Sequence, residues 1–336
     1  MTPTVSLIIP ARNEEKVIRN CIESLLNLDY PKNKLEIIVS IDGSTDKTLD
    51  ICKEYEPKIK VIGSSPKNCK AEAINEVLPV AKGEIIGIYD ADCIVDKKCL
   101  KKIVKRFSDE RVSGASGTVK SIRSNILSKT ISLETCFTSF LEYSLSKLGA
   151  NPHFVGKNMF IRKEVLEKIK GFNEYCFLED IELSLRMKRL KYKVVFEPKA
   201  ITWQREPEKL SSFIRQRIRW SRGIFRIKKL KRQSNLKTWF SDLIHGVPYY
   251  LSPFGMVIGT ILAIILFLNL PWLFVIPLIL LFSFNIFMIV YSRVFYRESL
   301  KDLIYLPLWF LLNNIYSLIL IPRAYLDEKR SKKIRW

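Results

Sequence analysis

Two long stretches in the C-terminal third of the chain contain no charged side chain. They are Val257–Leu268 and Leu270–Tyr291, and they lie within three apolar segments at about 246–268, 270–291 and 303–322. A run of about 18 or more apolar residues is long enough to cross the hydrocarbon core of a bilayer. The residues before about 243 mix apolar and charged side chains, as a water-soluble fold does. The sequence therefore predicts a soluble domain at 1–204 and a membrane domain at 243–322 with two to three transmembrane helices.

The basic charge of the chain is concentrated beside these apolar segments. The formal net charge is +21, and segment 205–240 alone carries a net +10, while the tail 323–336 carries +4. Basic residues next to a membrane segment suit an anionic cytoplasmic leaflet. Residues 208–231 combine this charge with an apolar side, which predicts an amphipathic helix at the membrane interface within a region 205–242. Nucleic-acid binding is the competing interpretation, but the charge does not accompany an aromatic-studded sheet, so we expect no nucleic acid as partner.

Other features favour a cytosolic location for the soluble part. The apolar run Val5–Ile9 is too short for a signal peptide, so we expect an integral protein of the plasma membrane whose soluble domain is cytoplasmic. The seven cysteines are scattered without a CxxC pair, which indicates free thiols and argues against a zinc site. With only two histidines, His153 and His245, any general base is expected to be a carboxylate.

Apolar strands alternate with amphipathic helices through the first 90 residues. Alternation of this kind predicts an α/β fold with a doubly wound, mostly parallel sheet covered on both faces. The expected strands are Val5–Ile9, Glu36–Ile41, Ile59–Ile62 and Ile85–Tyr89, with helices over Val17–Leu26, which Asn13 is expected to cap, and Lys70–Val80. Further along we expect strands at Ser113–Lys120 and Val194–Glu197, an extended segment at Val155–Arg162, and helices at Asn125–Leu148 and Glu179–Leu190.

Two acidic motifs stand just after expected strand ends, where ligands bind in open α/β sheets. Asp90-Ala91-Asp92 follows one strand, and two carboxylates at i and i+2 can hold one Mg²⁺ or Mn²⁺ whose remaining ligands are water and substrate phosphates. Asp42, before Gly43, follows another strand and could accept a hydrogen bond from a nucleobase or ribose. Surface turns also collect aspartates, so a capped helix start at Asp90 and an Asx turn at Asp42 are the structural alternatives.

Two further motifs carry candidate chemistry. Glu179-Asp180 opens an expected helix, where acids are also favoured by the helix dipole, and Asp180 could serve as a general base toward an acceptor hydroxyl. Gln216, Arg219 and Trp220 fall at i, i+3 and i+4 on the basic helix and so share a face. A guanidinium can hold a diphosphate in a bidentate manner and an indole can stack on a sugar. An interfacial Trp anchor is the structural alternative.

In their order and spacing these motifs resemble those of family 2 glycosyltransferases. The resemblance covers about residues 4–240 and is strongest to the membrane branch with hyaluronan, cellulose and poly-N-acetylglucosamine synthases and ceramide glucosyltransferase. The residues that carry it are Leu7-Ile8-Ile9-Pro10-Ala11-Arg12-Asn13-Glu14-Glu15, Asp42-Gly43-Ser44-Thr45-Asp46, Lys70-Ala71 with Asn75, Asp90-Ala91-Asp92, Glu179-Asp180 and Gln216-x-x-Arg219-Trp220.

The resemblance implies a GT-A fold and an inverting, metal-assisted transfer without a covalent intermediate. It implies that Asp180, with Glu179 beside it, is the catalytic base. It implies that Asp90 and Asp92 bind the metal and the donor, a UDP- or GDP-sugar, with Pro10, Glu14, Asp42 and Lys70 in the nucleotide-sugar site. Gln216, Arg219 and Trp220 would close over the diphosphate and the acceptor sugar.

Three apolar segments look too few to enclose a polymer channel within one chain, which favours transfer of single sugars to a lipid or lipid-linked saccharide. One alternative is a processive β-polysaccharide synthase whose channel is completed by oligomerisation or by a partner. Another is a non-catalytic membrane scaffold that keeps the GT-A shell, and a basic nucleic-acid binder is the remaining one. Product length and the effect of Asp180→Asn distinguish the first three, and salt-dependent RNA or DNA affinity would identify the last.

Overall fold

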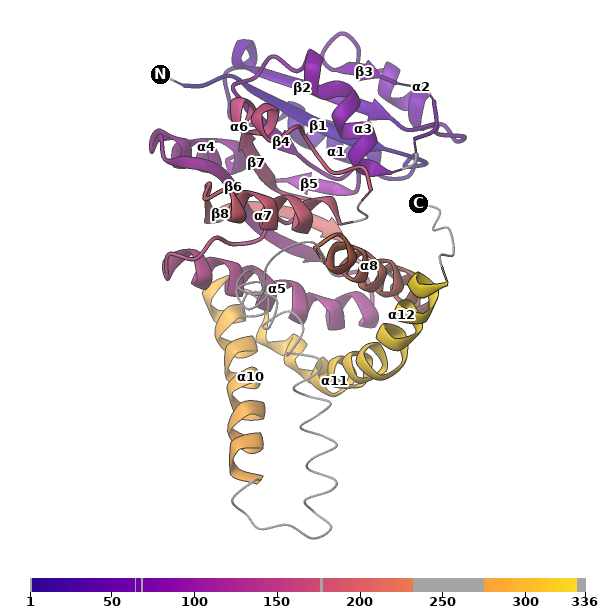
Figure 1. The fold of residues 1–336 in the computed structure, drawn as a ribbon, viewed down its shortest axis with the longest axis vertical. Coiled ribbons are helices and arrows are strands. Elements are labelled where there is room, and N and C mark those ends of the chain that lie inside the picture. The colour runs from indigo at the N-terminus through magenta and orange to yellow at the C-terminus, as the bar shows by residue number, and fades with distance from the viewer. Residues whose placement is uncertain (1, 64, 68, 176–177, 232–274, 331–336) are drawn as a thin grey trace. The chain divides into compact units, whose positions relative to one another are not determined.

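A computed structural model describes the chain except for residues 1, 64, 68, 176–177, 232–274 and 331–336, and the side chains of 228–231 and 275–282 (Figure 1). The described chain divides into two compact units. The first, called the sheet unit, comprises Met1–Ile122 and Thr138–Arg205, and the second, called the helical unit, comprises Arg123–Phe137 and Glu206–Ile334. The division falls within the long helix α5, Ile126–Lys147.

The sheet unit is built on one eight-stranded sheet with the order β3-β2-β1-β4-β7-β6-β8-β5. The pairs β1–β2, β1–β4, β2–β3 and β6–β8 are parallel, whereas β7 runs antiparallel to both its neighbours and β5 runs antiparallel to β8. The strands are β1 Val5–Ala11, β2 Leu35–Ile41, β3 Lys60–Ile62, β4 Ile85–Ile88, β5 Cys93–Val95, β6 Val112–Ile122, β7 Met159–Arg162 and β8 Lys193–Arg205.

Helices cover both faces of this sheet, as the alternating pattern predicts (Figure 1). Successive residues of a strand point to opposite faces. Leu7 and Ile9 of β1 therefore join one core cluster and Ile8 joins the other. The first core contains residues of α1, α2 and α4, and the second contains residues of α3, α6 and α7. Those helices are α1 Ile18–Leu26, α2 Thr48–Lys53, α3 Lys70–Val77, α4 Cys99–Val104, α6 Lys163–Lys168 and α7 Glu179–Arg189.

Three local expectations are wrong. Asn13 does not cap α1, which begins at Ile18 without a side-chain cap; Asn13 has φ +57° and its Oδ1 accepts a hydrogen bond from the Thr45 N–H at 2.8 Å. The segment expected to be extended over Val155–Arg162 begins with a turn, in which the Asn158 N–H donates to the Val155 carbonyl oxygen at 2.9 Å, and only Met159–Arg162 is a strand. The strand expected to end at Glu197 continues to Arg205, because a shift in its register against β6 accommodates Pro198, which cannot donate to the ladder.

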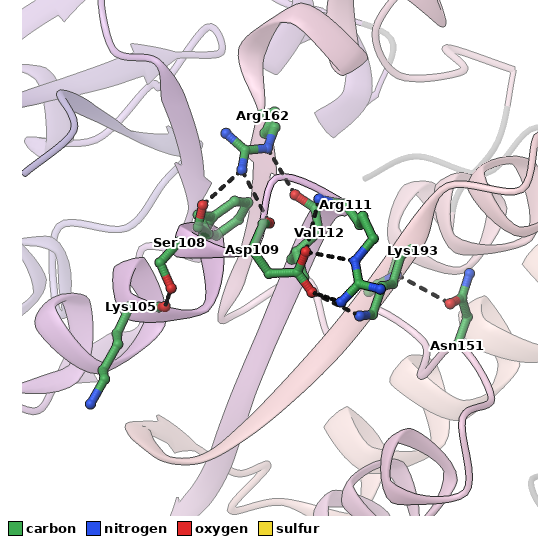
Figure 2. A network of polar contacts seen from close by, with 10 residues as sticks. Lys105, Ser108, Asp109, Arg111, Val112, Asn151, Arg162 and Lys193 are labelled. Atoms are coloured by element: carbon green, nitrogen blue, oxygen red, sulfur yellow. Dashed lines mark hydrogen bonds and ion pairs between the residues drawn. The ribbon is translucent and has the colours of Figure 1, made fainter. Parts of the chain in front are cut away.

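A network of polar contacts lies at one edge of the sheet unit, where β6 and β8 begin and β7 ends (Figure 2). Arg162, at the end of antiparallel β7, donates hydrogen bonds to the carbonyl oxygens of Val112 and Phe107, both at 2.8 Å. Asp109 accepts from Arg111 at 2.9 Å and from Lys193 at 3.0 Å. These contacts join the start of β6, the start of β8 and the end of β7, and we call them the Arg162 network.

The helical unit packs around the first half of α5. Leu133 clusters with Ile289 and Trp309, and Ile131 clusters with Phe213 and Leu312. These partners come from α8 Leu210–Lys231, α10 Val275–Phe295 and α11 Leu306–Ile315. The amphipathic helix expected at 208–231 is thus present as α8.

Within the described residues one helix, Leu300–Lys329, is long and apolar enough to cross a membrane. It includes α11 and α12, Ile321–Lys329. Asn313 and Asn314 do not interrupt it, because their side chains donate back to the carbonyl oxygens of Trp309 and Phe310 at 2.9 and 2.8 Å. Of the other two apolar segments, 246–268 lies outside the described residues and the second overlaps α10.

Candidate active site

The ends of β1, β2 and β4 bring Asp42 and Asp90 to one edge of the sheet unit. Ile41 pairs with Ala11, and the Asp42 N–H donates to the Ala11 carbonyl oxygen at 2.9 Å. On the other side of β1, Ile88 pairs with Ile8 two residues before Asp90. Parallel strands end at the same edge, so both aspartates lie at the carboxyl edge of the sheet, where sequence analysis placed them.

The antiparallel strand β7 adds a lysine that sequence analysis missed. Ile88 pairs with Met159, so two residues beyond this pair Asp90 stands opposite Lys157 in the continued register. The Lys157 Nζ lies 3.9 Å from Asp90 Oδ2 and 3.5 Å from Asp92 Oδ2. The direction of β7 is set by long-range pairing, so no local pattern pointed to this residue.

Lys70 joins the acidic motif of β4 to that of α7. Its Nζ lies 2.6 Å from Asp90 Oδ1 and 2.6 Å from Glu179 Oε1. Burial alone lowers the pKa of Lys70, but the charges of Asp90, Glu179 and Asp180 outweigh it and hold that pKa above its ordinary value. Lys70 is therefore charged at neutral pH and holds Asp90 and Glu179 beside each other.

Asp180 is held by the backbone next to this ion pair. Its Oδ2 accepts from the Gly156 N–H at 2.9 Å and its Oδ1 accepts from the Ile181 N–H at 2.8 Å. Burial, followed by the charge of Glu179, raises the pKa of Asp180 to about 6, although Lys70 acts in the opposite direction. A carboxylate with this pKa is ionised at neutral pH and is a stronger base than an ordinary aspartate.

Glu14 belongs to the same acidic group, and Pro10 lies one residue before the end of β1. Burial, and then the charges of Asp92 and Asp90, raise the pKa of Glu14 to about 7. Its N–H donates to Thr48 Oγ1 at 2.7 Å. Pro10 is buried within β1. Crowding of like charges is typical of sites that bind cations or transfer protons.

Asp42 carries an unmatched acceptor. The side chain is 2% exposed, its Oδ1 accepts from the Lys67 N–H, and Arg12 Nη1 lies 3.6 Å from Oδ2. Within the described residues Oδ2 is buried and accepts no hydrogen bond. Burial raises the pKa of Asp42, against the opposing effects of Lys67 and Arg12. A buried acceptor without a donor is costly and fits a ligand N–H or O–H.

The donor set at Asp90 and Asp92 fits a divalent cation shared with a substrate. Both carboxylates remain partly exposed, at 26% and 29%. Among the described residues no group of three or more His, Cys, Asp or Glu side chains could hold a metal ion by itself. Mg²⁺ is commonly held by one or two carboxylates with substrate phosphates and water, and this pair meets that requirement.

Gln216, Arg219 and Trp220 lie on α8 in the helical unit, with the buried Arg217 among them. Arg217 donates to both carboxylate oxygens of Glu134 at 2.6 Å, and its guanidinium lies 4.7 Å from the centre of the Trp220 ring. Among the described residues, Gln216 Oε1 is buried without a hydrogen-bond partner. Sequence analysis missed Arg217 and Glu134, whose pairing depends on how α5 packs against α8.

Several known proteins are similar to this chain in sequence. A probable glycosyltransferase of Bacillus subtilis, YdaM, is 34% identical over 78% of this chain and 66% of its own length. The β-monoglucosyldiacylglycerol synthase of a Nostoc species is 30% identical over 78% of this chain and 59% of its own. A poly-β-1,6-N-acetyl-D-glucosamine synthase of Staphylococcus epidermidis is 28% identical over 70% and 58%. The chain thus spans about two thirds or less of these relatives.

A solved structure shares the fold. The mannosyltransferase PcManGT of Pyrobaculum calidifontis, in complex with GDP-Man and Mn²⁺, superposes with a TM-score of 0.66 at 19% identity, covering 99% of this chain and 88% of that one. This likeness confirms the expected GT-A type of fold. The model of glycosyltransferase-like family 2 matches residues 3–223, about two thirds of the sequence. The chain therefore belongs to glycosyltransferase-like family 2.

Proposed function

We propose that this protein is an inverting glycosyltransferase that moves a sugar from a UDP- or GDP-sugar to a lipid or lipid-linked saccharide at the cytoplasmic face of the plasma membrane. The observation that carries the proposal is the position of Asp180. Its carboxylate, with a pKa raised to about 6, lies beside the Lys70 bridge that links Glu179 to Asp90 at the carboxyl edge of the sheet.

The donor would bind along this edge. Asp42 Oδ2, buried and without a hydrogen-bond donor in the described part of the chain, suits a base or ribose group of the nucleotide. Asp90 and Asp92 would hold Mg²⁺ or Mn²⁺ against the diphosphate, and Lys70 and Glu14 lie beside them. When bound, the cation would neutralise charge on the departing nucleoside diphosphate.

Asp180 would supply the base for the transfer. As the acceptor hydroxyl oxygen attacks the anomeric carbon, its proton passes to the Asp180 carboxylate. The bond from the anomeric carbon to the diphosphate oxygen breaks with its electron pair, and the nucleoside diphosphate departs. Attack opposite to the leaving group inverts the anomeric configuration. The Gly156 N–H, 2.9 Å from Asp180 Oδ2, would orient the carboxylate for this step.

Gln216, Arg219 and Trp220 would act on the diphosphate and the acceptor sugar. The support for this role is the family motif itself, together with the buried and unmatched Oε1 of Gln216. The Trp220 ring already has the Arg217 guanidinium close to it. The proposed role of Trp220 is to stack one face of its indole ring on the acceptor sugar.

Attachment to a membrane is supported by the helical unit. Leu300–Lys329 is apolar over the length of a bilayer, and α8 carries basic residues along its whole length. Large apolar side chains on α10 and α11, such as Phe284, Phe287 and Leu311, are more than half exposed in the absence of lipid. Exposed apolar surface of this kind marks a lipid or protein contact.

The choice of a lipid acceptor is tested by the product. Membranes containing the full chain are incubated with radiolabelled UDP- and GDP-sugars, with Asp180→Asn membranes as control. We expect a short, chloroform-soluble labelled product that the variant does not make. A labelled high polymer would instead establish the processive synthase, which the similarity to a poly-N-acetylglucosamine synthase favours. Equal label from wild type and Asp180→Asn, or none from either, would leave the scaffold as the better account.

A further inference from the structure

Lys157 is a charged group at the candidate site that the proposed chemistry does not use. Its Nζ lies 3.5 Å from Asp92 Oδ2 and 3.9 Å from Asp90 Oδ2. The side chain is 18% exposed, so a substrate at the partly exposed Asp90 and Asp92 would be within its reach. An ammonium group therefore lies close to the two carboxylates that are proposed to hold a divalent cation.

The backbone on each side of Lys157 is anchored. The Gly156 N–H donates to Asp180 Oδ2 at 2.9 Å, and a Cβ built on Gly156 would stand 3.2 Å from Lys70 Nζ. Asn158 is fully buried and its Nδ2 donates to the Ala200 carbonyl oxygen at 3.0 Å. The side chain of Lys157 thus starts from a fixed point within the site, and a change of its rotamer would redirect the ammonium without moving the backbone.

The carboxylates of Asp90 and Asp92 are ion-pair partners of Lys157, and they indicate its role. Asp90 Oδ1 pairs with Lys70, while Asp90 Oδ2 and Asp92 Oδ2 face Lys157. Asp90 and Asp92 are the residues that would hold a divalent cation, so the cation would lie close to the Lys157 ammonium. An ammonium 3.5 Å from one of them would repel a divalent ion strongly, since the interaction between charges falls only with the first power of distance.

We infer that Lys157 is a built-in counter-ion that holds Asp90 and Asp92 in place before a divalent cation binds, and that turns to the donor diphosphate once cation and nucleotide are both present. This inference rests on the proposed function. Lys157 then makes binding of the cation alone weak and binding of the cation with the nucleotide strong. In thermodynamic terms it creates positive coupling between the two ligands, which must be reciprocal.

The test is a titration of the full chain with Mn²⁺ alone. The concentration of free Mn²⁺ is measured by electron paramagnetic resonance at each step and gives the affinity for the ion. Lys157→Met removes the charge and keeps the length of the side chain, and Lys157→Arg keeps the charge. Lys101→Met, which removes a lysine from a surface pair with Asp29, controls for net charge. We expect Lys157→Met to bind Mn²⁺ about tenfold more tightly than wild type, about 1.4 kcal/mol. The other two variants should match wild type.

A second titration, with UDP or GDP at saturating Mn²⁺, should show about tenfold weaker nucleotide binding by Lys157→Met. Equal Mn²⁺ affinity in wild type and Lys157→Met, or weaker affinity in the variant, would overturn the inference and leave the proposed function standing. Failure of wild type and variant alike to bind Mn²⁺ even with UDP and GDP would remove the metal role of Asp90 and Asp92, and the inference with it. Circular dichroism spectra confirm that each variant is folded.

Discussion

The two edges of the sheet in the sheet unit treat charge in opposite ways. In the Arg162 network the one acid, Asp109, is paired with bases: contacts with Arg111 and Lys193 hold its pKa below the ordinary value (Figure 2). At the carboxyl edge acids are crowded, and burial with neighbouring acids raises the pKa of Glu14 to about 7 and that of Asp180 to about 6. The ion pairs of the Arg162 network stabilise the folded state, whereas the crowded acids of the carboxyl edge are suited to binding cations and protons.

This difference predicts that the carboxyl edge determines activity and that the Arg162 network contributes to stability. Substitutions at the carboxyl edge should change ligand binding or turnover with little loss of fold. Substitution of Arg162, whose guanidinium holds two backbone carbonyl groups, should lower the free energy of unfolding, and no substitution in the Arg162 network should change turnover per folded molecule.

The largest effect is expected from Asp180→Asn. Loss of the proposed general base should lower kcat by about 10³-fold, within the range known for such groups, because an amide cannot accept the acceptor's proton. Nucleotide affinity should stay within about twofold of wild type. Steady-state transfer assays and isothermal titration calorimetry measure the two quantities. Loss of nucleotide affinity with kcat retained would show that Asp180 binds the donor instead.

Asp92→Asn should come next. We expect nucleotide affinity in the presence of Mn²⁺ to fall by about 10- to 100-fold, because one of the two carboxylate ligands is lost. Affinity measured in EDTA should not change. Calorimetric titrations of UDP and GDP with and without Mn²⁺ provide the comparison. Wild-type activity that persists in EDTA would refute the metal role at this edge.

Arg162→Met tests the opposite edge. Its guanidinium donates to the carbonyl oxygens of Val112 and Phe107, and loss of these charged hydrogen bonds should lower the free energy of unfolding by about 2 kcal/mol. Urea denaturation followed by circular dichroism measures the change. Transfer activity per folded molecule should match wild type. A large drop in kcat would contradict the claim that the Arg162 network affects stability alone.

Glu14→Gln gives a pH-dependent effect. The folded pKa of Glu14, about 7, lies above the ordinary 4.5. Its contribution to stability is therefore present below about pH 4.5 and is lost as the pH rises through 7. Glutamine removes this loss, so we expect the variant to equal wild type near pH 4, to gain on it between pH 4.5 and 7, and to be more stable by about 1 kcal/mol at pH 8. Parallel slopes of stability against pH would show that Glu14 is not crowded by Asp90 and Asp92.

The smallest effect is expected from Lys193→Met in the Arg162 network. Lys193 pairs with Asp109 at the surface, where single ion pairs contribute about 0–1 kcal/mol. Thermal unfolding and transfer activity should both stay close to wild type. A large loss of either would show that the network is more than a set of independent contacts.

The core of the fold and half of the site follow from local patterns. The apolar runs before Asp42 and Asp90 predict β2 and β4, and the turn residues after them place both aspartates at the carboxyl edge. The alternation of strand and helix predicts the parallel part of the sheet. These features depend on residues that are neighbours in sequence, which is why they could be predicted.

The remainder depends on contacts between distant segments. No local signal shows that β7 runs antiparallel to β4, and Lys157 reaches Asp90 only because of that direction. The extension of β8 past Pro198 requires the register shift against β6, and the pairing of Arg217 with Glu134 requires the packing of α5 on α8. Each of these was missed for the same reason: side chains far apart in sequence are brought together by tertiary structure.

The central claim is that the crowded carboxyl edge binds a nucleoside diphosphate through a divalent cation. A thermal-shift titration of the full chain with UDP and GDP, each with and without Mn²⁺, tests it directly, because a ligand that binds the folded state raises the unfolding temperature. The account predicts a shift with one of the two nucleotides only when Mn²⁺ is present, and its loss in Asp92→Asn. A shift that is independent of Mn²⁺ and survives Asp92→Asn would contradict it.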